Sequence, residues 1–102
     1  MAKGIFNITS AATTTLADIY GRNGAIKYIS LSNTHNSTAD TIELFLEDNS
    51  GDKYYIVKTD IPGKTTLVLS ETISFDNSVL ALKLTTSAGG LSTSTPLSVI
   101  IK

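Results

Sequence analysis

Short strand-type segments separated by turn residues are the feature that most constrains the fold of this chain. The clearest segment is 40–48, in which Ile42, Leu44 and Leu46 alternate with charged or aromatic residues. A period of two is that of a β-strand with one face in a core. About eight such segments follow one another, and none shows the 3.6-residue period of an amphipathic helix. They comprise residues 4–9, 13–20, 25–33, 40–48, 52–59, 64–70, 79–86 and 97–102.

This succession of strands predicts an all-β protein. With 102 residues, of which 41% are hydrophobic, the chain can form one domain with a core but not two domains. We expect a single antiparallel two-sheet β-sandwich, jelly-roll or immunoglobulin-like, since an isolated sheet would leave one apolar face in water. A small barrel is the next choice. Residues 13–102 would form the sandwich, and residues 1–12 an N-terminal arm or a weak first strand.

Charge and composition argue against several classes of partner. The net charge is −1 and no basic patch is visible, so we expect no nucleic-acid partner. The first residues contain no apolar run long enough for a signal peptide or a membrane span, which predicts synthesis in the cytosol and no membrane contact. The chain has no Cys, which excludes disulfides and thiolate metal sites. We therefore expect neither a metal nor another cofactor.

The triplet Gly63-Lys64-Thr65 resembles the end of a phosphate-binding loop. That motif needs a further Gly at position 58, which is Lys58, and a helix after the Thr. The residues after Thr65 instead read as a strand. In a turn, Pro62 would fix φ and Gly63 would tolerate a positive φ. We therefore predict a bend between two strands rather than a nucleotide site.

The other candidates for chemistry are equally incomplete. Residues 48–52 resemble a calcium loop but lack its flanking helices and the Glu at its twelfth position, so a hairpin turn is favoured. His35 is the only histidine, and the sequence contains no recognisable nucleophile motif for which it could act as the base. The carboxylates lie mostly where solvated groups usually do, and the chain has no Trp to line a sugar cleft. We predict no catalytic residue and no enzyme activity.

Sugar binding is retained as an alternative because tyrosines can stack on sugar rings. The four tyrosines are Tyr20, Tyr28, Tyr54 and Tyr55. Trp usually leads such platforms, so packed core or interface tyrosines are the favoured interpretation. The sequence does not decide which of Tyr54 and Tyr55 faces the core, because apolar residues stand on both sides of that segment.

Several strands are apolar on both faces. Phe45 should face opposite Ile42, Leu44 and Leu46, and Ile100 opposite its neighbours at 97, 99 and 101. One face of each strand fills the core, and an apolar outer face usually marks a contact surface. Cover by loops or by the N-terminal segment is an equally good explanation. The candidate interface residues are Ile5, Phe6, Phe45, Tyr55, Val79 and Ile100.

The order of segments from residue 13 to residue 90 resembles a known group of proteins. It runs through TTTLADIYG, AIKYISLSN and TIELFLED to KYYIVKTDIPGKTTLVL and VLALKLTTSAGG. This is similar to small β-sandwich structural proteins of tailed bacteriophage virions, especially cyanophages. The resemblance covers about three-quarters of the chain. Its motifs are structural, and similar combinations of turns and strands occur in unrelated sandwiches.

The resemblance implies a non-enzymatic part of a virion, made in the host cytoplasm. A capsid decoration or cement protein that binds the major capsid protein is the first expectation. A neck, tail or baseplate accessory and a carbohydrate-binding module are the alternatives. The expected partners are the major capsid protein or other virion proteins, and a second copy of the chain is compatible with this expectation.

Overall fold

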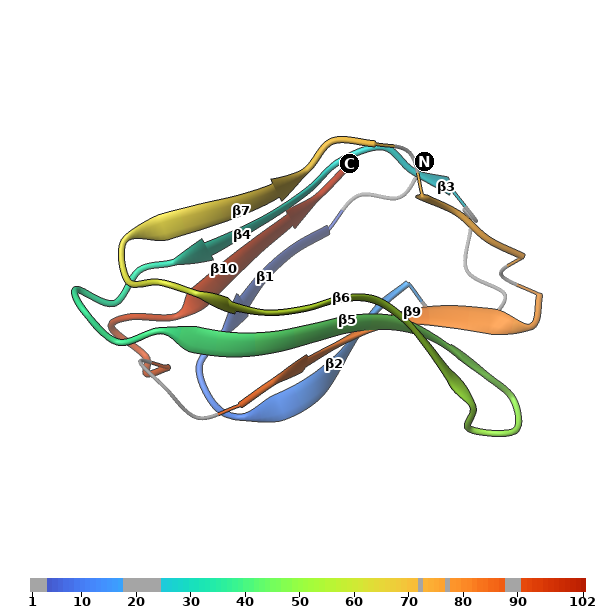
Figure 1. Ribbon diagram of the computed structural model, residues 1–102, viewed down its shortest axis with the longest axis horizontal. Helices are drawn as coiled ribbons and strands as arrows, with labels where there is room; N and C mark the ends of the chain where they lie inside the picture. Colours follow the sequence, from blue (N-terminus) through green and yellow to red (C-terminus); the bar gives the residue numbers. More distant parts are fainter. Residues whose placement is uncertain (1–3, 18–24, 72, 77, 88–90) are drawn as a thin grey trace.

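The computed structural model describes residues 4–17, 25–71, 73–76, 78–87 and 91–102. These residues form two facing antiparallel sheets (Figure 1). Sheet A consists of β1 (Gly4–Ile8), β10 (Leu97–Ile101), β4 (Ile29–Asn33) and β7 (Thr65–Leu69), in that spatial order. Sheet B consists of β2 (Ala12–Ala17), β9 (Leu80–Thr86), β5 (Asp40–Asp48) and β6 (Lys53–Ile61). A two-stranded ribbon joins β3 (Ala25–Ile26) to β8 (Ile73–Ser74). The predicted all-β sandwich is confirmed.

The strand order identifies the sandwich as a jelly roll. The first and last strands pair, as β1 with β10, and so do the second and the second-last, as β2 with β9. The remaining long strands pair in the same nested way, as β4 with β7 and β5 with β6. This is the pattern of a long hairpin folded over on itself, with alternate pairs in opposite sheets. The structure thereby decides between the two predicted sandwich types.

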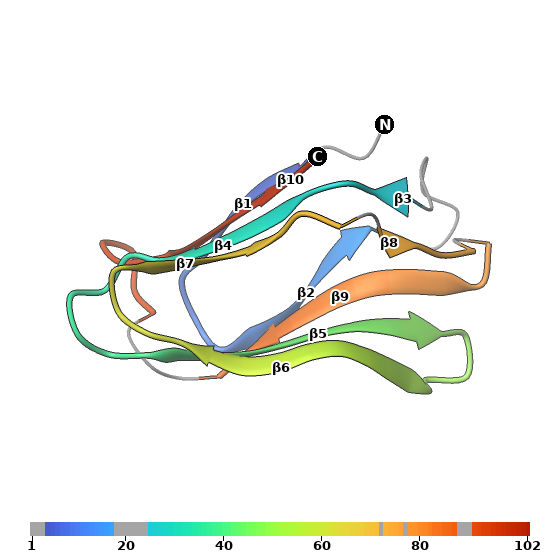
Figure 2. The ribbon, with the colours of Figure 1, turned by 45° about the horizontal axis from the view of Figure 1, so that its top comes forward.

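The two sheets face each other (Figure 2). The core between them consists of inward side chains from both sheets. Leu31 and Val99 from sheet A meet Leu44 and Leu82 from sheet B, all fully buried. Complete burial of a side chain of this size contributes about 1.5–3 kcal/mol relative to exposure. This core fixes the inner face of every long strand, so the remaining alternate residues must point outward.

Predicted segment 25–33 is two strands rather than one. The chain leaves sheet A at Lys27 and Tyr28, whose backbone N–H groups both donate to the carbonyl of Lys102, at 2.8 and 3.2 Å. Beyond this point β3 pairs only with β8. Ile26 and Ile29 are both buried although they stand three positions apart, so the period of two changes phase at the break. The predicted turn at 21–24 and the end of segment 13–20 lie outside the described residues.

The bend between β6 and β7 is confirmed, but the predicted role of Gly63 is wrong. Lys64, not Gly63, has the positive φ, of 58°. A Cβ at position 63 would lie 2.8 Å from both the carbonyl oxygen of His35 and the N of Ser37. Glycine is needed there because the backbone of the β4–β5 loop passes so close. The bend therefore holds two loops together and offers no phosphate site.

Candidate functional site

The outer face of sheet A carries a row of apolar side chains that crosses all four strands. Ile5 on β1 pairs with Ile100 on β10, Ile100 pairs with Ser30 on β4, and Ser30 pairs with Val68 on β7. Ser30 is buried, whereas Ile5, Ile100 and Val68 are 80%, 37% and 45% exposed. Their alternate neighbours fill the core, so these side chains project into solvent. We call Ile5, Ile100 and Val68 the apolar row.

A row of neutral polar side chains lies directly beside the apolar row. The Ser98 hydroxyl donates to Asn7 Oδ1 at 2.8 Å, across β10 and β1. On the other half of the sheet, the hydroxyls of Ser32 and Thr66 are 2.9 Å apart. Paired hydroxyls of this kind satisfy one another without charge. The outer face of sheet A is therefore neutral, with apolar and polar rows side by side.

The two sheets differ sharply in ionisable residues. The four strands of sheet A contain no Asp, Glu, Lys, Arg or His. The strands of sheet B carry Asp40, Glu43, Glu47 and Asp48 on β5, Lys53, Lys58 and Asp60 on β6, and Lys83 on β9. Charged side chains on strands favour water and oppose association with a neutral surface. The neutral face of sheet A is therefore the better contact surface.

Phe45 occupies the centre of the outer face of sheet B, yet it is fully buried. It faces away from the core, as predicted, and lies between Lys83 on β9 and Tyr55 on β6. The ring of Tyr55 is 5.6 Å from the ring of Phe45, and Lys53 Nζ is 5.0 Å from the Phe45 centroid. Lysine stems can cover apolar surface while the ammonium stays in water. Phe45 is therefore not available to a partner.

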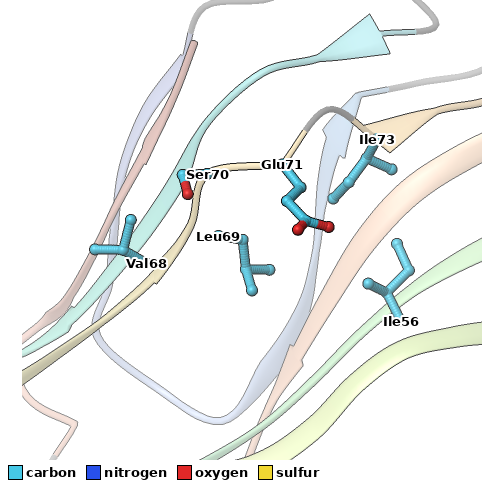
Figure 3. Close-up of a pocket in the computed structure, with 6 residues that line it drawn as sticks. All are labelled: Ile56, Val68, Leu69, Ser70, Glu71 and Ile73. Atoms are coloured by element: carbon cyan, nitrogen blue, oxygen red, sulfur yellow. The ribbon is translucent and has the colours of Figure 1, made fainter.

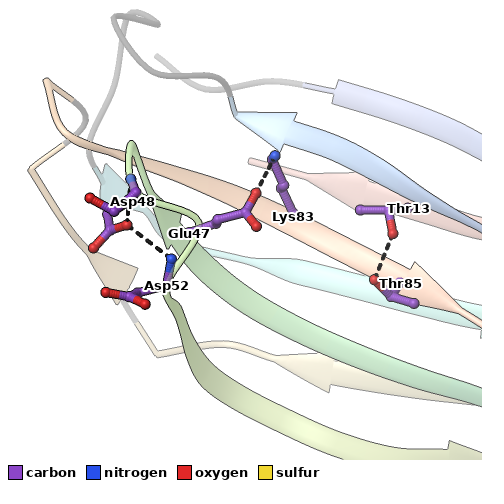
Figure 4. A network of polar contacts seen from close by, with 7 residues as sticks. Thr13, Glu47, Asp48, Asp52, Lys83 and Thr85 are labelled. Atoms are coloured by element: carbon purple, nitrogen blue, oxygen red, sulfur yellow. Dashed lines mark hydrogen bonds and ion pairs between the residues drawn. The ribbon is translucent and has the colours of Figure 1, made fainter.

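Ion pairs surround this covered phenylalanine. Lys83 donates to Glu47, and Lys58 lies 3.9 Å from Glu43. On the same face the hydroxyls of Thr13 and Thr85 are 2.9 Å apart (Figure 4). Partly exposed ion pairs contribute only about 0–1 kcal/mol each. They nevertheless leave few unpaired charges with which sheet B could attract a partner.

The predicted interface residues thus fall into separate groups. Ile5 and Ile100 are neighbours on sheet A, and Phe45 and Tyr55 are neighbours on sheet B. Phe6 points inward and packs against the core cluster, while Val79 lies in the turn before β9. No single surface contains all six. Sequence reasoning did not select Val68, although its position between Leu67 and Leu69 already marked it as an outward residue of β7.

A bulge on β6 settles the orientation of the two neighbouring tyrosines. Tyr54 pairs with Leu46 and Tyr55 with Phe45, but the next partner of β5 is Val57, so Ile56 is the extra residue. Tyr55 therefore lies on the outer face, and Tyr54 and Val57 lie on the core side. Unbroken alternation along segment 52–59 predicts that Tyr55 and Val57 share a face, and this prediction is wrong because the bulge shifts the alternation by one residue.

The calcium-like loop is a hairpin turn. Asp48 Oδ1 accepts hydrogen bonds from the N–H groups of Ser50 and Asp52, at 2.9 and 3.0 Å, and Gly51 has a φ of 88°. The hydroxyl of Tyr54 donates to Asp48 Oδ2 at 3.3 Å. The charge of Asp48, with lesser contributions from burial and from Asp52, raises the pKa of Tyr54. Within the described ranges, no three His, Cys, Asp or Glu side chains are arranged to hold a metal ion.

His35 has a structural role in the loop between β4 and β5. Its Nδ1 accepts hydrogen bonds from the N–H groups of Ser37 and Thr38, at 3.1 and 3.0 Å. The preceding Asn33 is buried, and its Nδ2 donates to the carbonyls of Thr38 and Ile61, at 2.9 and 2.8 Å. Because Asn33 ends β4 and Ile61 ends β6, this amide joins the two sheets. Sequence reasoning missed Asn33, whose partner lies 28 positions away.

Lysines lie over the rings of two of the described tyrosines, while Tyr54 is 54% exposed. Lys58 Nζ lies 4.6 Å from the centroid of the Tyr55 ring, and Lys102 Nζ lies 5.5 Å from that of Tyr28. A lysine over an aromatic face takes the position that a sugar ring would need. Tyr20 lies outside the described residues.

A shallow groove of about 400 Å³ opens between the edge strands β6 and β7. Ile56 lies on its sheet B side, Leu69 lines it from β7, and Glu71 and Ile73 line it from the segment that follows β7 (Figure 3). Its polar lining residues are Ser70 and Glu71. In the part of the chain that the structure describes, no helix is long and apolar enough to cross a membrane.

No family model and no curated protein sequence matches the chain. Among solved structures, a chain in the structure of infectious bursal disease virus, Gt strain, is similar with a TM-score of 0.38 and 13% identity. The alignment covers 98% of this chain but only 31% of that one, so this chain spans about a third of its length. Values this low define neither a family nor a function.

Proposed function

We propose that this chain is a non-enzymatic structural protein of a virion, and that it binds the particle through the outer face of sheet A. The observation that carries the proposal is the neutral outer face with its exposed apolar row. Exposure of the apolar side chains of such a face to water is unfavourable. Burial of the face requires no charge to be desolvated, because its four strands contain no ionisable residue. The jelly-roll strand order supports the proposal, because this architecture recurs in viral capsid proteins.

Within this class we propose a capsid decoration or cement protein of a tailed bacteriophage, with the major capsid protein as partner. The resemblance of residues 13–90 to small phage structural proteins supports this choice. Hydroxyl rows beside an apolar row provide neutral hydrogen bonds at the rim of a contact whose centre is apolar. A neck, tail or baseplate accessory would use the same face but would occur in far fewer copies.

Copy number separates these two roles. Mass spectrometry of purified particles would give the number of chains per major capsid subunit. A ratio near one, or a simple fraction of it, is expected for a decoration protein. A handful of copies would assign it to the neck, tail or baseplate, and complete absence from particles would refute the virion role.

The contact face is tested by adding purified variants to particles that lack the chain. Ile100→Asp places a charge in the apolar row, whereas Thr15→Asp places one on the exposed outer face of sheet B. We expect Ile100→Asp to weaken binding by at least about tenfold, because the charge must be desolvated on contact. Thr15→Asp should bind normally. Equal losses in both variants would refute sheet A as the contact face.

Folding of the variants is checked by circular dichroism before binding is measured. If Ile100→Asp does not fold, Val68→Asp carries the test, since Val68 lies at the edge of the same row with its side chain half exposed. Normal binding by a folded Val68→Asp protein would then count against the proposal.

A further inference from the structure

The sandwich has four edge strands, and they are protected to different degrees. An edge strand has unpaired backbone N–H and C=O groups that can pair with another chain, and proteins usually guard it with charges, proline or a bulge. On sheet B, β6 carries Lys53, Lys58 and Asp60 and is bulged at Ile56. The other edge of sheet B, β2, is irregular between Thr15 and Ala17. Neither edge strand of sheet B is both regular and uncharged.

The two edges of sheet A also differ from each other. β7 follows Lys64, whose positive φ ends the ladder, and it borders the groove that contains Glu71. β1 and β7 both consist of five residues without charge, proline or bulge, but the outward Ile5 of β1 is 80% exposed, whereas Val68 of β7 is 45% exposed. Its register with β10 is unbroken from Gly4 to Ile8. Among the described strands, β10 is the only neighbour of β1.

The side chains of β1 are those of a strand that lacks a second neighbour. Ile5 is 80% exposed, the highest value among the large hydrophobic residues that the structure describes as exposed. Ile100 on β10 lies beside Ile5 on one side, and no described strand lies on the other side. A second strand along β1 would cover the free side of Ile5. Burial of an isoleucine side chain in a contact raises the affinity by a factor of at least about ten.

We infer that β1 pairs with β1 of a second copy of this chain, so that two copies of sheet A form one continuous eight-stranded sheet. In a contact about a two-fold axis residue i of one copy meets residue j of the other and j meets i, so the strand pairs with its own reversed sequence and charges of one sign on it would repel. β1 meets this condition because it is entirely neutral. A charged partner strand would find no opposite charge on β1. Pairing would also place two apolar rows in line on one outer face.

The oligomeric state of the purified full chain tests this inference without any particle. Sedimentation velocity over a range of concentrations is expected to show a reversible dimer. Ile5→Lys guards the edge with a charge and should raise the dimer dissociation constant at least about tenfold. Val68→Lys is the matched control, since it adds the same charge at the opposite edge of the same row, and it should leave dimerisation unchanged.

Amide hydrogen exchange supplies a second measurement. The backbone amides of residues 4–8 should exchange more slowly as the wild-type concentration rises, and this dependence should be absent in Ile5→Lys. Circular dichroism establishes that both variants fold. A monomeric wild-type chain, a dimer that survives Ile5→Lys, or a dimer lost in Val68→Lys would each overturn the inference. Since none of these outcomes involves a particle, they leave the proposed virion role standing.

A different strand could occupy the same edge. If the wild-type chain is monomeric but the backbone amides of residues 4–8 exchange more slowly when particles are added, β1 accepts a strand from another virion protein. That result would refute self-pairing.

Discussion

The outer faces of the two sheets each contain large apolar side chains, but only one of them leaves those side chains in contact with water. Phe45 on sheet B is completely buried, whereas Ile100 on sheet A is 37% exposed. The difference comes from the neighbours. Lysines and Tyr55 cover Phe45, while serines and threonines are too short to cover the apolar row. An outward apolar residue therefore indicates a contact surface only where its cross-strand neighbours are small.

The largest expected effect comes from removing the covered ring on sheet B. Phe45→Ala should lower the free energy of unfolding by about 3 kcal/mol or more, because it leaves a cavity beneath Lys53 and Tyr55. Ile5→Ala, on the uncovered row, should change it by less than about 0.5 kcal/mol. Urea denaturation of both variants measures the difference. Similar losses in the free energy of unfolding for the two variants would show that Phe45 is no better packed than Ile5.

The next effect tests the link between the two sheets. Asn33→Ala leaves two carbonyls and one N–H without the hydrogen bonds that the buried amide now provides, and should cost about 2–3 kcal/mol. Ser32→Ala is the neighbouring control, since it removes only a surface hydroxyl pair with Thr66. It should stay within about 0.5 kcal/mol of wild type by thermal or chemical denaturation. A loss in Ser32→Ala as large as in Asn33→Ala would contradict the special role of the amide.

A smaller effect concerns the ion pairs that only sheet B has. Lys58→Met removes the exposed pair with Glu43 and should destabilise the fold by no more than about 1 kcal/mol at low salt. The difference from wild type should shrink as salt is added, since exposed charges are screened. Denaturation at two salt concentrations measures it. The same substitution effect at both concentrations would indicate lost packing on Tyr55 rather than lost charge.

The smallest effect is confined to alkaline solution. The pKa of Tyr54 is raised because Asp48 disfavours the tyrosinate, so this contribution to stability is present below about pH 10 and is lost as pH rises through the raised value. Asp48→Asn should lower the pKa of Tyr54, as measured by ultraviolet titration against a Tyr54→Phe reference. An unchanged titration would show that Asp48 does not control this hydroxyl.

The sequence predicted the strands well where alternation was unbroken. Segment 40–48 matches β5 residue for residue, because its period of two continues from one end to the other. Prediction failed where the backbone departed from regular geometry. The bulge at Ile56 reversed the expected face of Val57, and the break at Lys27 divided one predicted strand into two. Neither irregularity has a local signature, since both depend on hydrogen bonds to strands distant in the sequence.

The candidate site could be predicted only in part. Alternation alone placed Ile100 and Phe45 on outer faces, but it could not show that one is bare and the other covered. That difference depends on which strands lie beside them. Phe45 is flanked by Tyr55 on β6, 10 positions later in the sequence, and by Lys83 on β9, 38 positions later. The predicted group of six interface residues therefore divided between two faces, a turn and the core.

By itself the sequence determined that this chain is an antiparallel β-sandwich, because periodicity and turn residues act over a few neighbouring positions. It also determined that the segments 4–8, 29–33, 65–69 and 97–101 each lack an ionisable residue. Only the tertiary structure decided that these four strands lie side by side, which brings Ile5, Ile100 and Val68 into one row. The physical reason is that strand pairing is non-local, so a surface exists only once hydrogen bonds have set the order and register of strands.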